Sequence, residues 1–174
     1  NRGEVLSRLK ERAAMIRPAT SADASAICSI YNHYIENTVI TFEENPLTED
    51  EMAERIRAYS EKYAYIVYEE DGEVIGYAYG SSWRTRRAYR FSTETTVYLK
   101  DGAAGKGIGS LLYSELIERL KGKGFHSLIG CITLPNEKSV RLHEKMGFKK
   151  VAHFHEAGWK FDQWLDVGFW ELLV

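Results

Sequence analysis

A glycine-rich segment near the middle of the chain offers the clearest combination of residue types and spacing for chemistry. Residues 93–99 have the composition of a strand, and Gly105, Gly107 and Gly109 then alternate with other residues just before a helical pattern begins. Because glycine has no Cβ, several backbone N–H groups can converge on one anion there. The N-terminal end of the following helix adds positive potential, so the segment predicts a phosphate-binding site.

Two common phosphate-binding motifs fit this segment poorly. A nucleoside-triphosphate loop needs a hydroxyl residue after its lysine, but Gly107 follows Lys106. A dinucleotide fingerprint needs its third glycine one residue later than Gly109, and an acidic residue about twenty positions further on. Residues 129–131 lie there and carry no acid. A tight strand-to-helix turn without a ligand is the remaining alternative.

Length and charge predict one compact domain that acts on a small molecule. The chain has 174 residues, of which 44% are hydrophobic, which is enough for one core but too little for two comfortable domains. We expect residues 15–174 to form that domain and residues 1–14 to be an N-terminal extension or a cloning remnant. The formal net charge is −2 with interspersed signs. Neither a nucleic acid nor a membrane is therefore an expected partner.

Cysteine content and the lack of targeting signals predict a cytoplasmic protein. Cys28 and Cys131 lie far apart in apolar patterns, and we expect both thiols to be reduced and buried. No apolar run is long enough to span a bilayer, and the first residues lack the apolar segment of a secretion signal.

Hydrophobic periodicity predicts alternating strands and helices. A capping-box pattern begins at Thr20, and a second helix begins at Thr48 with a glutamate three positions on. The predicted helical faces contain Ile27, Ile30, Tyr31 and Tyr34; Met52, Ile56, Tyr59 and Tyr63; and Ile108, Leu111, Leu112, Leu116 and Leu120. A further helix covers residues 136–146. The predicted strands lie near residues 16–17, in a hairpin over residues 64–83 that turns at Asp71-Gly72, and within residues 91–99, 128–133 and 149–173.

In this order of elements and in several motifs, the chain resembles the GCN5-related N-acetyltransferases. Within that superfamily it is most similar to the branch that acetylates phosphinothricin and methionine sulfone or sulfoximine. Matching segments extend over nearly all of residues 15–173. They are Tyr31-Asn-His-Tyr-Ile35, Glu94-Thr-Thr-Val-Tyr98, Gly105-Lys-Gly-Ile-Gly-Ser110, Leu134-Pro-Asn136, Asn136 to Phe148, and Asp166-Val-Gly-Phe-Trp170.

The resemblance implies an acyl-CoA N-acyltransferase fold, a mixed α/β architecture with three layers, α-β-α. Its central sheet is mixed and mostly antiparallel, and it splays open between two parallel strands. Acetyl-CoA, the implied co-substrate, enters that gap like a partial extra strand. No metal is implied.

The resemblance also assigns residues to the acetyl-CoA site. The implied pyrophosphate cradle is Gly105, Lys106, Gly107, Ile108, Gly109 and Ser110. Val97, Tyr98 and Leu99 would bind the pantetheine arm and the thioester carbonyl through their backbone. Asn136 matches a position that contacts the cofactor, although it is also a good helix N-cap, and both roles are compatible.

Acetyl transfer to an amine needs groups that handle protons, because the amine must lose a proton and the departing thiolate must gain one. Glu94 is the candidate base, since it lies in an otherwise uncharged strand where partial burial would raise its pKa. The alternative is a solvent-facing strand glutamate. His143 falls at a position where many superfamily members have a tyrosine that acts as a general acid. Three roles are open for this histidine: a general acid, a group that orients substrate or water, or a packed helix residue. Cys131 has no activating base nearby in sequence, which favours direct transfer.

Acceptor recognition is predicted from an arginine-rich loop and from nearby aromatic residues. Arginine can bind a carboxylate or phosphinate through two hydrogen bonds. The matching loop in the branch contacts substrate, and the candidate residues here are Arg84, Arg87, Tyr89 and Arg90. Tyr31, Tyr34 and Phe42 are candidate pocket walls, although tyrosines at helical spacing also suit a core.

The sequence thus predicts an enzyme that transfers acetyl from acetyl-CoA to the amino group of a small amino-acid-like acceptor. Phosphinothricin, methionine sulfone and methionine sulfoximine are the acceptors that the resemblance implies. The alternatives are acetylation of another small amine or of a protein N-terminus, and a non-catalytic acyl-CoA sensing module. Relatives in the branch form dimers, so a homodimer is expected. The aromatic tail with Trp164, Phe169 and Trp170 would lie either in that interface or in the core.

Overall fold

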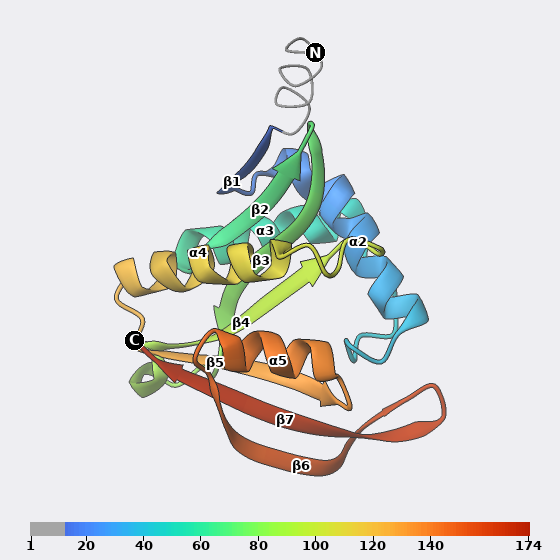
Figure 1. Cartoon of the computed structure of the whole chain (residues 1–174), viewed down its shortest axis with the longest axis vertical. Helices are drawn as coiled ribbons and strands as arrows, with labels where there is room; N and C mark the ends of the chain where they lie inside the picture. The colour runs from blue at the N-terminus through green and yellow to red at the C-terminus, as the bar shows by residue number, and fades with distance from the viewer. Residues whose placement is uncertain (1–12) are drawn as a thin grey trace, which may run out of the picture.

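The structure, a computed structural model, describes residues 13–174 and contains one seven-stranded sheet with helices on both faces (Figure 1). Residues 1–12, most of the predicted extension, lie outside the described residues. The strands are β1 (Ala14–Pro18), β2 (Tyr65–Glu70), β3 (Glu73–Ser82), β4 (Ser92–Leu99), β5 (Ser127–Leu134), β6 (Lys149–Lys160) and β7 (Gln163–Leu173). The helices are α2 (Ala24–Asn37), α3 (Glu49–Lys62), α4 (Ile108–Gly122) and α5 (Glu137–Lys145), with short 3₁₀ turns at Ser21–Asp23 and Arg87–Tyr89.

The sheet has the strand order β1-β2-β3-β4-β5-β7-β6, and only β4 and β5 run parallel to each other. Their pairing extends from Ser92 opposite Ser127 to Thr95 opposite Gly130 and then stops. Both strands continue beyond that point, so they diverge, as Figure 1 shows between β4 and β5. This confirms the predicted mixed sheet that opens between two parallel strands.

Alternation of side chains along the strands creates one core on each face of the sheet. Tyr65 and Val67 of β2 pack with α2 and α3, whereas Ile66 between them packs with α4. The second core also includes Leu128 and Ile132 of β5 together with residues from α5. The sheet is therefore the middle of three layers, as predicted.

The predicted helix starts are confirmed by their capping contacts. The Thr48 hydroxyl accepts a hydrogen bond from the backbone N–H of Glu51 at 3.1 Å. The Thr20 capping box also forms, with the Thr20 N–H donating to Asp23 at 2.8 Å, although a 3₁₀ turn precedes α2. These caps satisfy backbone donors that would otherwise lack partners at the helix ends.

Two predictions about burial are wrong. Leu111 is 55% exposed, because the buried stripe of α4 runs through Ile108 and Leu112 and turns Leu111 away from the sheet. Cys131 is exposed, whereas Cys28 is buried as expected. The alternation of β5 directs Ile132 into the core beneath α4 and α5, so Cys131 faces the other side.

The aromatic residues of the tail differ in burial. Trp170 is 2% exposed and belongs to the core, while Trp164 is 60% exposed near the tip of the β6–β7 hairpin. No helix within residues 13–174 combines the length and apolar character required to cross a bilayer.

Candidate active site

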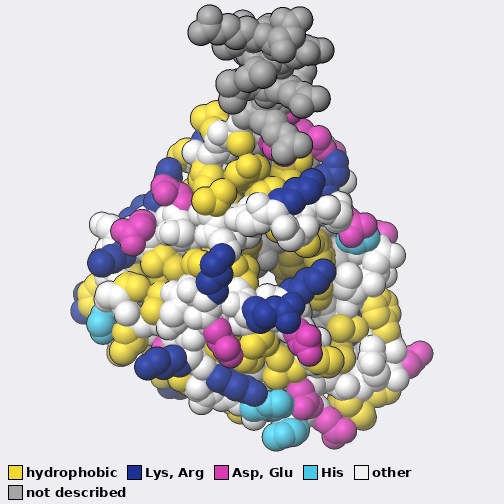
Figure 2. All heavy atoms as spheres, viewed as in Figure 1, with side chains coloured by type: hydrophobic (Ala, Val, Ile, Leu, Met, Phe, Trp, Pro, Cys, Tyr) yellow, Lys and Arg dark blue, Asp and Glu magenta, His cyan; other side chains and the backbone are white. Residues whose placement is uncertain are grey.

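A cavity of about 260 Å³ lies where β4 and β5 diverge. Residues from β4, β5, α5 and the loop after α2 line it. They include Tyr31, Phe42, Glu94, Val97, Tyr98, Cys131, Thr133, Asn136, Ser139 and His143. Figure 2 shows a hollow near the centre of the displayed face, with Lys and Arg side chains at its rim. The cavity brings the two candidate catalytic residues, Glu94 and His143, to one site.

Glu94 lies on the face of β4 that is turned toward α2. Tyr98, four residues along the strand, packs against Tyr31 and Tyr34 of α2, whereas Thr95 hydrogen bonds to a tyrosine of α4 on the other face. Burial raises the pKa of Glu94. Within residues 13–174 its carboxylate forms no ion pair, so it is available to a group in the cavity.

His143 approaches the same gap from the opposite face, on α5. Its Nδ1 lies 2.7 Å from the carbonyl oxygen of Ser139, which can only accept, so Nδ1 carries the hydrogen. Burial lowers the pKa of His143, and the ring rests edge-on against Tyr113 and Phe148. The imidazole is therefore neutral near pH 7, and Nε2 is a hydrogen-bond acceptor in this state.

Gly130 on β5 provides the space that His143 occupies. A Cβ at this position would lie 2.4 Å from Nε2 of His143 and 2.5 Å from its Cδ2. Gly130 is also the last β5 residue that pairs with β4, opposite Thr95. The histidine ring is thus seated where the two parallel strands begin to separate. The sequence analysis missed Gly130, because no local pattern indicates that a side chain 13 residues away requires a glycine there.

The glycine segment forms the turn predicted for an anion site. Gly105 and Gly107 have φ values of +84° and +80°, a region that favours glycine, and a Cβ at either would meet nothing within 4 Å. Gly107 is the N-cap of α4, and no side chain among the described residues caps this end. The first N–H groups of the helix are therefore available to an anion, while Lys106 is exposed beside them.

Lys145 adds positive charge to this segment, and the sequence analysis missed it. Its Nζ donates to the hydroxyl of Ser110 at 3.1 Å, which joins the last turn of α5 to the first turn of α4. The two residues are 35 positions apart, so sequence spacing alone gave no signal of the contact.

The edge of β4 that faces β5 has no strand partner from residue 96 onward, which leaves backbone groups near Val97 and Tyr98 for a ligand. Leu99 differs from these two residues. Its carbonyl oxygen already accepts a hydrogen bond from the Tyr34 hydroxyl at 2.5 Å. Tyr34 consequently supports the strand and is absent from the cavity lining, unlike Tyr31 and Phe42.

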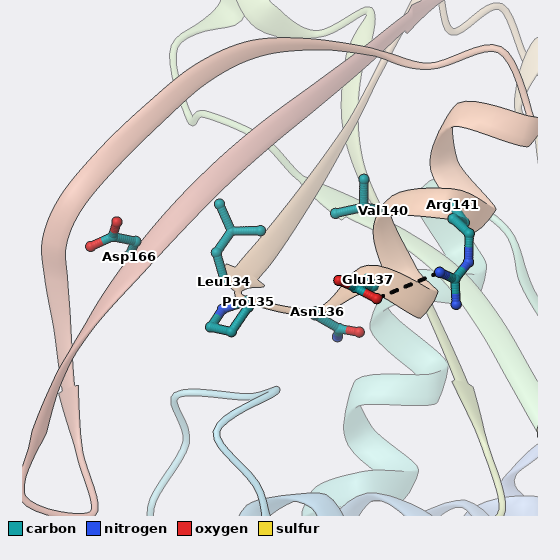
Figure 3. Close-up of a pocket in the computed structure, with 7 residues that line it drawn as sticks. All are labelled: Leu134, Pro135, Asn136, Glu137, Val140, Arg141 and Asp166. Atoms are coloured by element: carbon teal, nitrogen blue, oxygen red, sulfur yellow. Dashed lines mark ion pairs between the residues drawn. The ribbon is translucent and has the colours of Figure 1, made fainter.

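Asn136 has the N-cap role that the sequence suggested. Its side chain accepts a hydrogen bond from the N–H of Ser139 at 3.2 Å. Figure 3 shows Asn136 at the start of α5, where it also lines a second, open pocket with Leu134, Val140 and Asp166. A cofactor role remains compatible with this cap, because the residue borders both pockets.

The arginine-rich loop does not line the Glu94 cavity. Arg84 and Tyr89 line a small pocket of their own with Thr85 and Arg86. Arg87 and Arg90 are exposed and line neither this pocket nor the cavity; the Arg90 guanidinium donates to the Arg87 carbonyl at 3.2 Å. The structure therefore brings together Glu94, His143 and the β4 backbone, but not the predicted acceptor-binding arginines.

The cavity roof is a loop held by a buried lysine. Lys160 is 2% exposed, and its Nζ donates to the carbonyl oxygen of Thr41 at 2.8 Å. The Tyr31 hydroxyl also bonds to the Thr41 hydroxyl at 2.8 Å. The ring of Phe42 fits against Gly158, where a Cβ would approach it to 2.4 Å. The β6 strand thus fixes the residues that cover the cavity.

Cys131 opens into the cavity but is poorly suited to be a nucleophile. Although Cys131 is exposed to the open cavity, the surrounding protein partly desolvates its thiol, and this desolvation together with the negative charge of Glu94 raises the pKa of Cys131 to about 12. The thiol is therefore protonated at neutral pH, whereas the thiolate is the reactive form. This favours direct transfer over a covalent acetyl-enzyme.

The fold corresponds to that of known acetyltransferases. Residues 16–168 match the family model described as an acetyltransferase (GNAT) domain. The chain belongs to the GNAT family of acetyltransferases.

Relatives within the family are named for small amino-acid-like substrates. The chain is 40% identical to a phosphinothricin N-acetyltransferase of Streptomyces viridochromogenes, over 93% of this chain and 88% of the relative. It is 35% identical to an L-methionine sulfoximine/L-methionine sulfone acetyltransferase of Salmonella typhimurium, over 90% of this chain and 92% of the relative. A phosphinothricin acetyltransferase structure from Sinorhizobium meliloti, in complex with AcCoA, superposes with a TM-score of 0.89 at 40% identity, covering 92% of this chain and 88% of that one.

Proposed function

We propose that this enzyme transfers the acetyl group of acetyl-CoA to the amino group of phosphinothricin, methionine sulfone or methionine sulfoximine. The observation that carries the proposal is the cavity at the β4–β5 divergence, where the half-buried carboxylate of Glu94 lies near the unpaired edge of β4. The names of relatives at 35–40% identity support the choice of acceptors.

Several features of the chain fit acetyl-CoA. The uncapped start of α4, with Gly105 and Gly107 in the left-handed region, suits its pyrophosphate, and Lys106 and Lys145 add positive charge. The open edge of β4 suits the amide groups of its pantetheine arm. When bound, acetyl-CoA supplies the thioester that the amine attacks.

Glu94 is proposed as the group that collects the amine proton, directly or through water. A carboxylate with a raised pKa is a better proton acceptor than an ordinary surface glutamate. His143 is proposed as a positioning residue, because its neutral ring offers Nε2 as an acceptor and carries no second proton to give to the thiolate. Of the three roles that the sequence left open for His143, this favours the orienting group, and the departing thiolate takes its proton from water.

The proposed acceptor contacts outside the cavity are Arg84, Arg87, Tyr89 and Arg90. Their support is that all four are exposed and that the arginines form no ion pair with any residue of the described chain. Free guanidinium groups can bind the carboxylate or phosphinate of an acceptor. None of the four lines the Glu94 cavity, so an acceptor that also contacts Glu94 would have to extend beyond that cavity to reach them.

We expect thiol release from acetyl-CoA with these three acceptors and little with ordinary amino acids or peptides. The measurement is a thiol-release assay with a panel that contains phosphinothricin, methionine sulfone, methionine sulfoximine, proteinogenic amino acids and a peptide. Turnover only with the peptide or with other amines would contradict the proposed acceptors but keep the acetyltransferase activity. Cofactor binding without turnover on any acceptor would support the sensing alternative.

We also propose a cytoplasmic homodimer whose interface includes the tip of the β6–β7 hairpin. Phe154, Trp159, Phe161 and Trp164 are each more than half exposed on this hairpin, and exposed apolar patches of this kind commonly mark interfaces.

Light scattering should give twice the mass of one chain for the unchanged protein, and Trp164→Glu should reduce it to the mass of one chain. Leu111→Glu, an exposed leucine on α4, is the matched control. A single-chain mass for the unchanged protein would contradict the dimer, and cell fractionation checks the location.

A further inference from the structure

The β6–β7 hairpin brings together three side chains that are common metal ligands. Each of His153, His155 and Asp166 offers one ligand atom, and these atoms all lie within 4.8 Å of one another. This is the only such group among residues 13–174. Histidine side chains gather beside acidic ones at the lower edge of the molecule in Figure 2, where Figure 1 shows the hairpin.

Strand geometry places these side chains on one surface. His153 and His155 are two residues apart on β6, and their rings stack with centroids 4.5 Å apart and an interplanar angle of 20°. Asp166 lies across the hairpin on β7, next to a register irregularity between Phe154 and Gly158. Its Oδ2 is 2.8 Å from Nε2 of His153.

The carboxylate is held in place independently of the histidines. Oδ1 of Asp166 accepts a hydrogen bond from the backbone N–H of Glu156 at 2.8 Å. Glu156 has a φ of +50°, so the irregular stretch of β6 turns this N–H toward β7. Hydrogen bonds of this kind orient carboxylates in metal sites.

We propose that His153, His155 and Asp166 form a binding site for a divalent transition-metal cation, with zinc as the reference ion. Two imidazoles and one carboxylate are a donor set that Zn²⁺ accepts, with water completing the coordination. The ligands are partly exposed, since the His153 and Asp166 side chains retain 32% and 33% of their accessible surface. A cation can therefore enter from solvent.

Lys150 competes with the metal for His153. Without metal, Nε2 of His153 carries the hydrogen and donates to Asp166, while Nδ1 accepts from Lys150 Nζ at 3.0 Å. Metal binding through Nε2 displaces that hydrogen. The ring then carries its hydrogen on Nδ1, so Lys150 can no longer donate to Nδ1 and must withdraw. For a neutral ring this is a transfer of one hydrogen from Nε2 to Nδ1, whereas a protonated ring would release one proton to solvent.

The competing interpretation is an ordinary surface hydrogen bond from His153 to Asp166 without a metal. Such a hydrogen bond does not depend on His155, and loss of Lys150 would not create metal affinity. The metal proposal requires both histidines. It also predicts that removing the lysine charge strengthens binding.

The test is titration of the untagged, chelator-treated full chain with zinc chloride in a calorimeter at pH 7.5. We expect one zinc per chain, with affinity reduced about tenfold or more by His155→Ala or Asp166→Asn. Lys150→Ala should bind zinc more tightly. His126→Ala, another exposed histidine outside the cluster, is the control and should match the unchanged protein.

Three results would overturn the proposal. One is no heat of binding at millimolar zinc. Another is an equal reduction of zinc affinity by His155→Ala and by His126→Ala, which would indicate that zinc binds to scattered surface histidines. The third is binding that survives in His155→Ala and Asp166→Asn without change. Circular dichroism of each variant identifies any loss of folding, and cobalt absorption spectra then provide a second readout of the same ligands.

Discussion

Replacing Glu94 with glutamine should lower kcat by about 10²- to 10⁴-fold, the usual contribution of a positioned general base. Glutamine keeps the size of the side chain but cannot collect a proton. The Michaelis constant for acetyl-CoA should change little, because the proposed cofactor contacts are at the start of α4 and along the edge of β4. Steady-state kinetics with saturating acceptor measures both quantities.

The pH profile gives an independent check on Glu94. Because burial raises its pKa, the acidic limb of kcat should lie above the ordinary range for glutamate, with activity falling as pH drops through that pKa. The glutamine variant should lack this limb. A group with a raised pKa stabilises the folded state at low pH and loses that contribution as pH rises through the folded pKa. Glu94→Gln should therefore not lower the melting temperature at pH 8.

A neighbouring glutamate supplies the matched control for this experiment. Ile129 on β5 lies between Glu94 on β4 and Glu171 on β7, and it pairs with both. Glu171, unlike Glu94, does not line the cavity. Glu171→Gln should keep its activity. Equal losses of kcat and of acetyl-CoA binding in Glu94→Gln would make Glu94 a structural residue.

Substitution of Gly130 by alanine should both destabilise the protein and impair catalysis. The new Cβ would lie 2.4 Å from Nε2 of His143, whose ring is fixed by Ser139 and packed against Tyr113 and Phe148. Overpacking of this kind costs about 1–3 kcal/mol. The displaced ring would also disturb the point at which β4 and β5 separate. Denaturant unfolding and kcat/KM measure the two effects.

A double-mutant cycle tests whether the clash with His143 is the cause. In the His143→Ala background the alanine at position 130 meets no imidazole, so Gly130→Ala should cost much less stability there. Gly122→Ala is the control, because a Cβ at Gly122 would contact nothing within 4 Å and its φ is not positive. Equal costs of Gly130→Ala in both backgrounds would show that the cause lies in the strand and not in the histidine.

The sequence predicted features that depend on neighbours along the chain. The caps at Thr48 and Asn136 form because a side chain two or three residues before an N–H can reach it. The glycine turn before α4 is likewise a local arrangement of backbone angles. The opening of the sheet came from family resemblance, because no local pattern specifies where two parallel strands part.

Features that depend on distant neighbours could not be predicted. Leu111 has the same residue type as Leu112, and only the position of the sheet decides which of them is buried. The exposure of Cys131 depends on which face of β5 borders the open cavity. The Lys145–Ser110 contact and the fit of Gly130 to His143 depend on how α5 packs over β5.

The short β4–β5 pairing also has a consequence for how the molecule unfolds. Within the sheet, only four residue pairs join the β1–β4 part to the β5–β7–β6 part, while the core under α4 packs against both parts. A molecule inserted between the diverging strands would replace the missing hydrogen bonds on both sides. Occupancy of the gap should therefore strengthen the connection between the two parts of the sheet, and amide hydrogen exchange would slow in the strands that flank it.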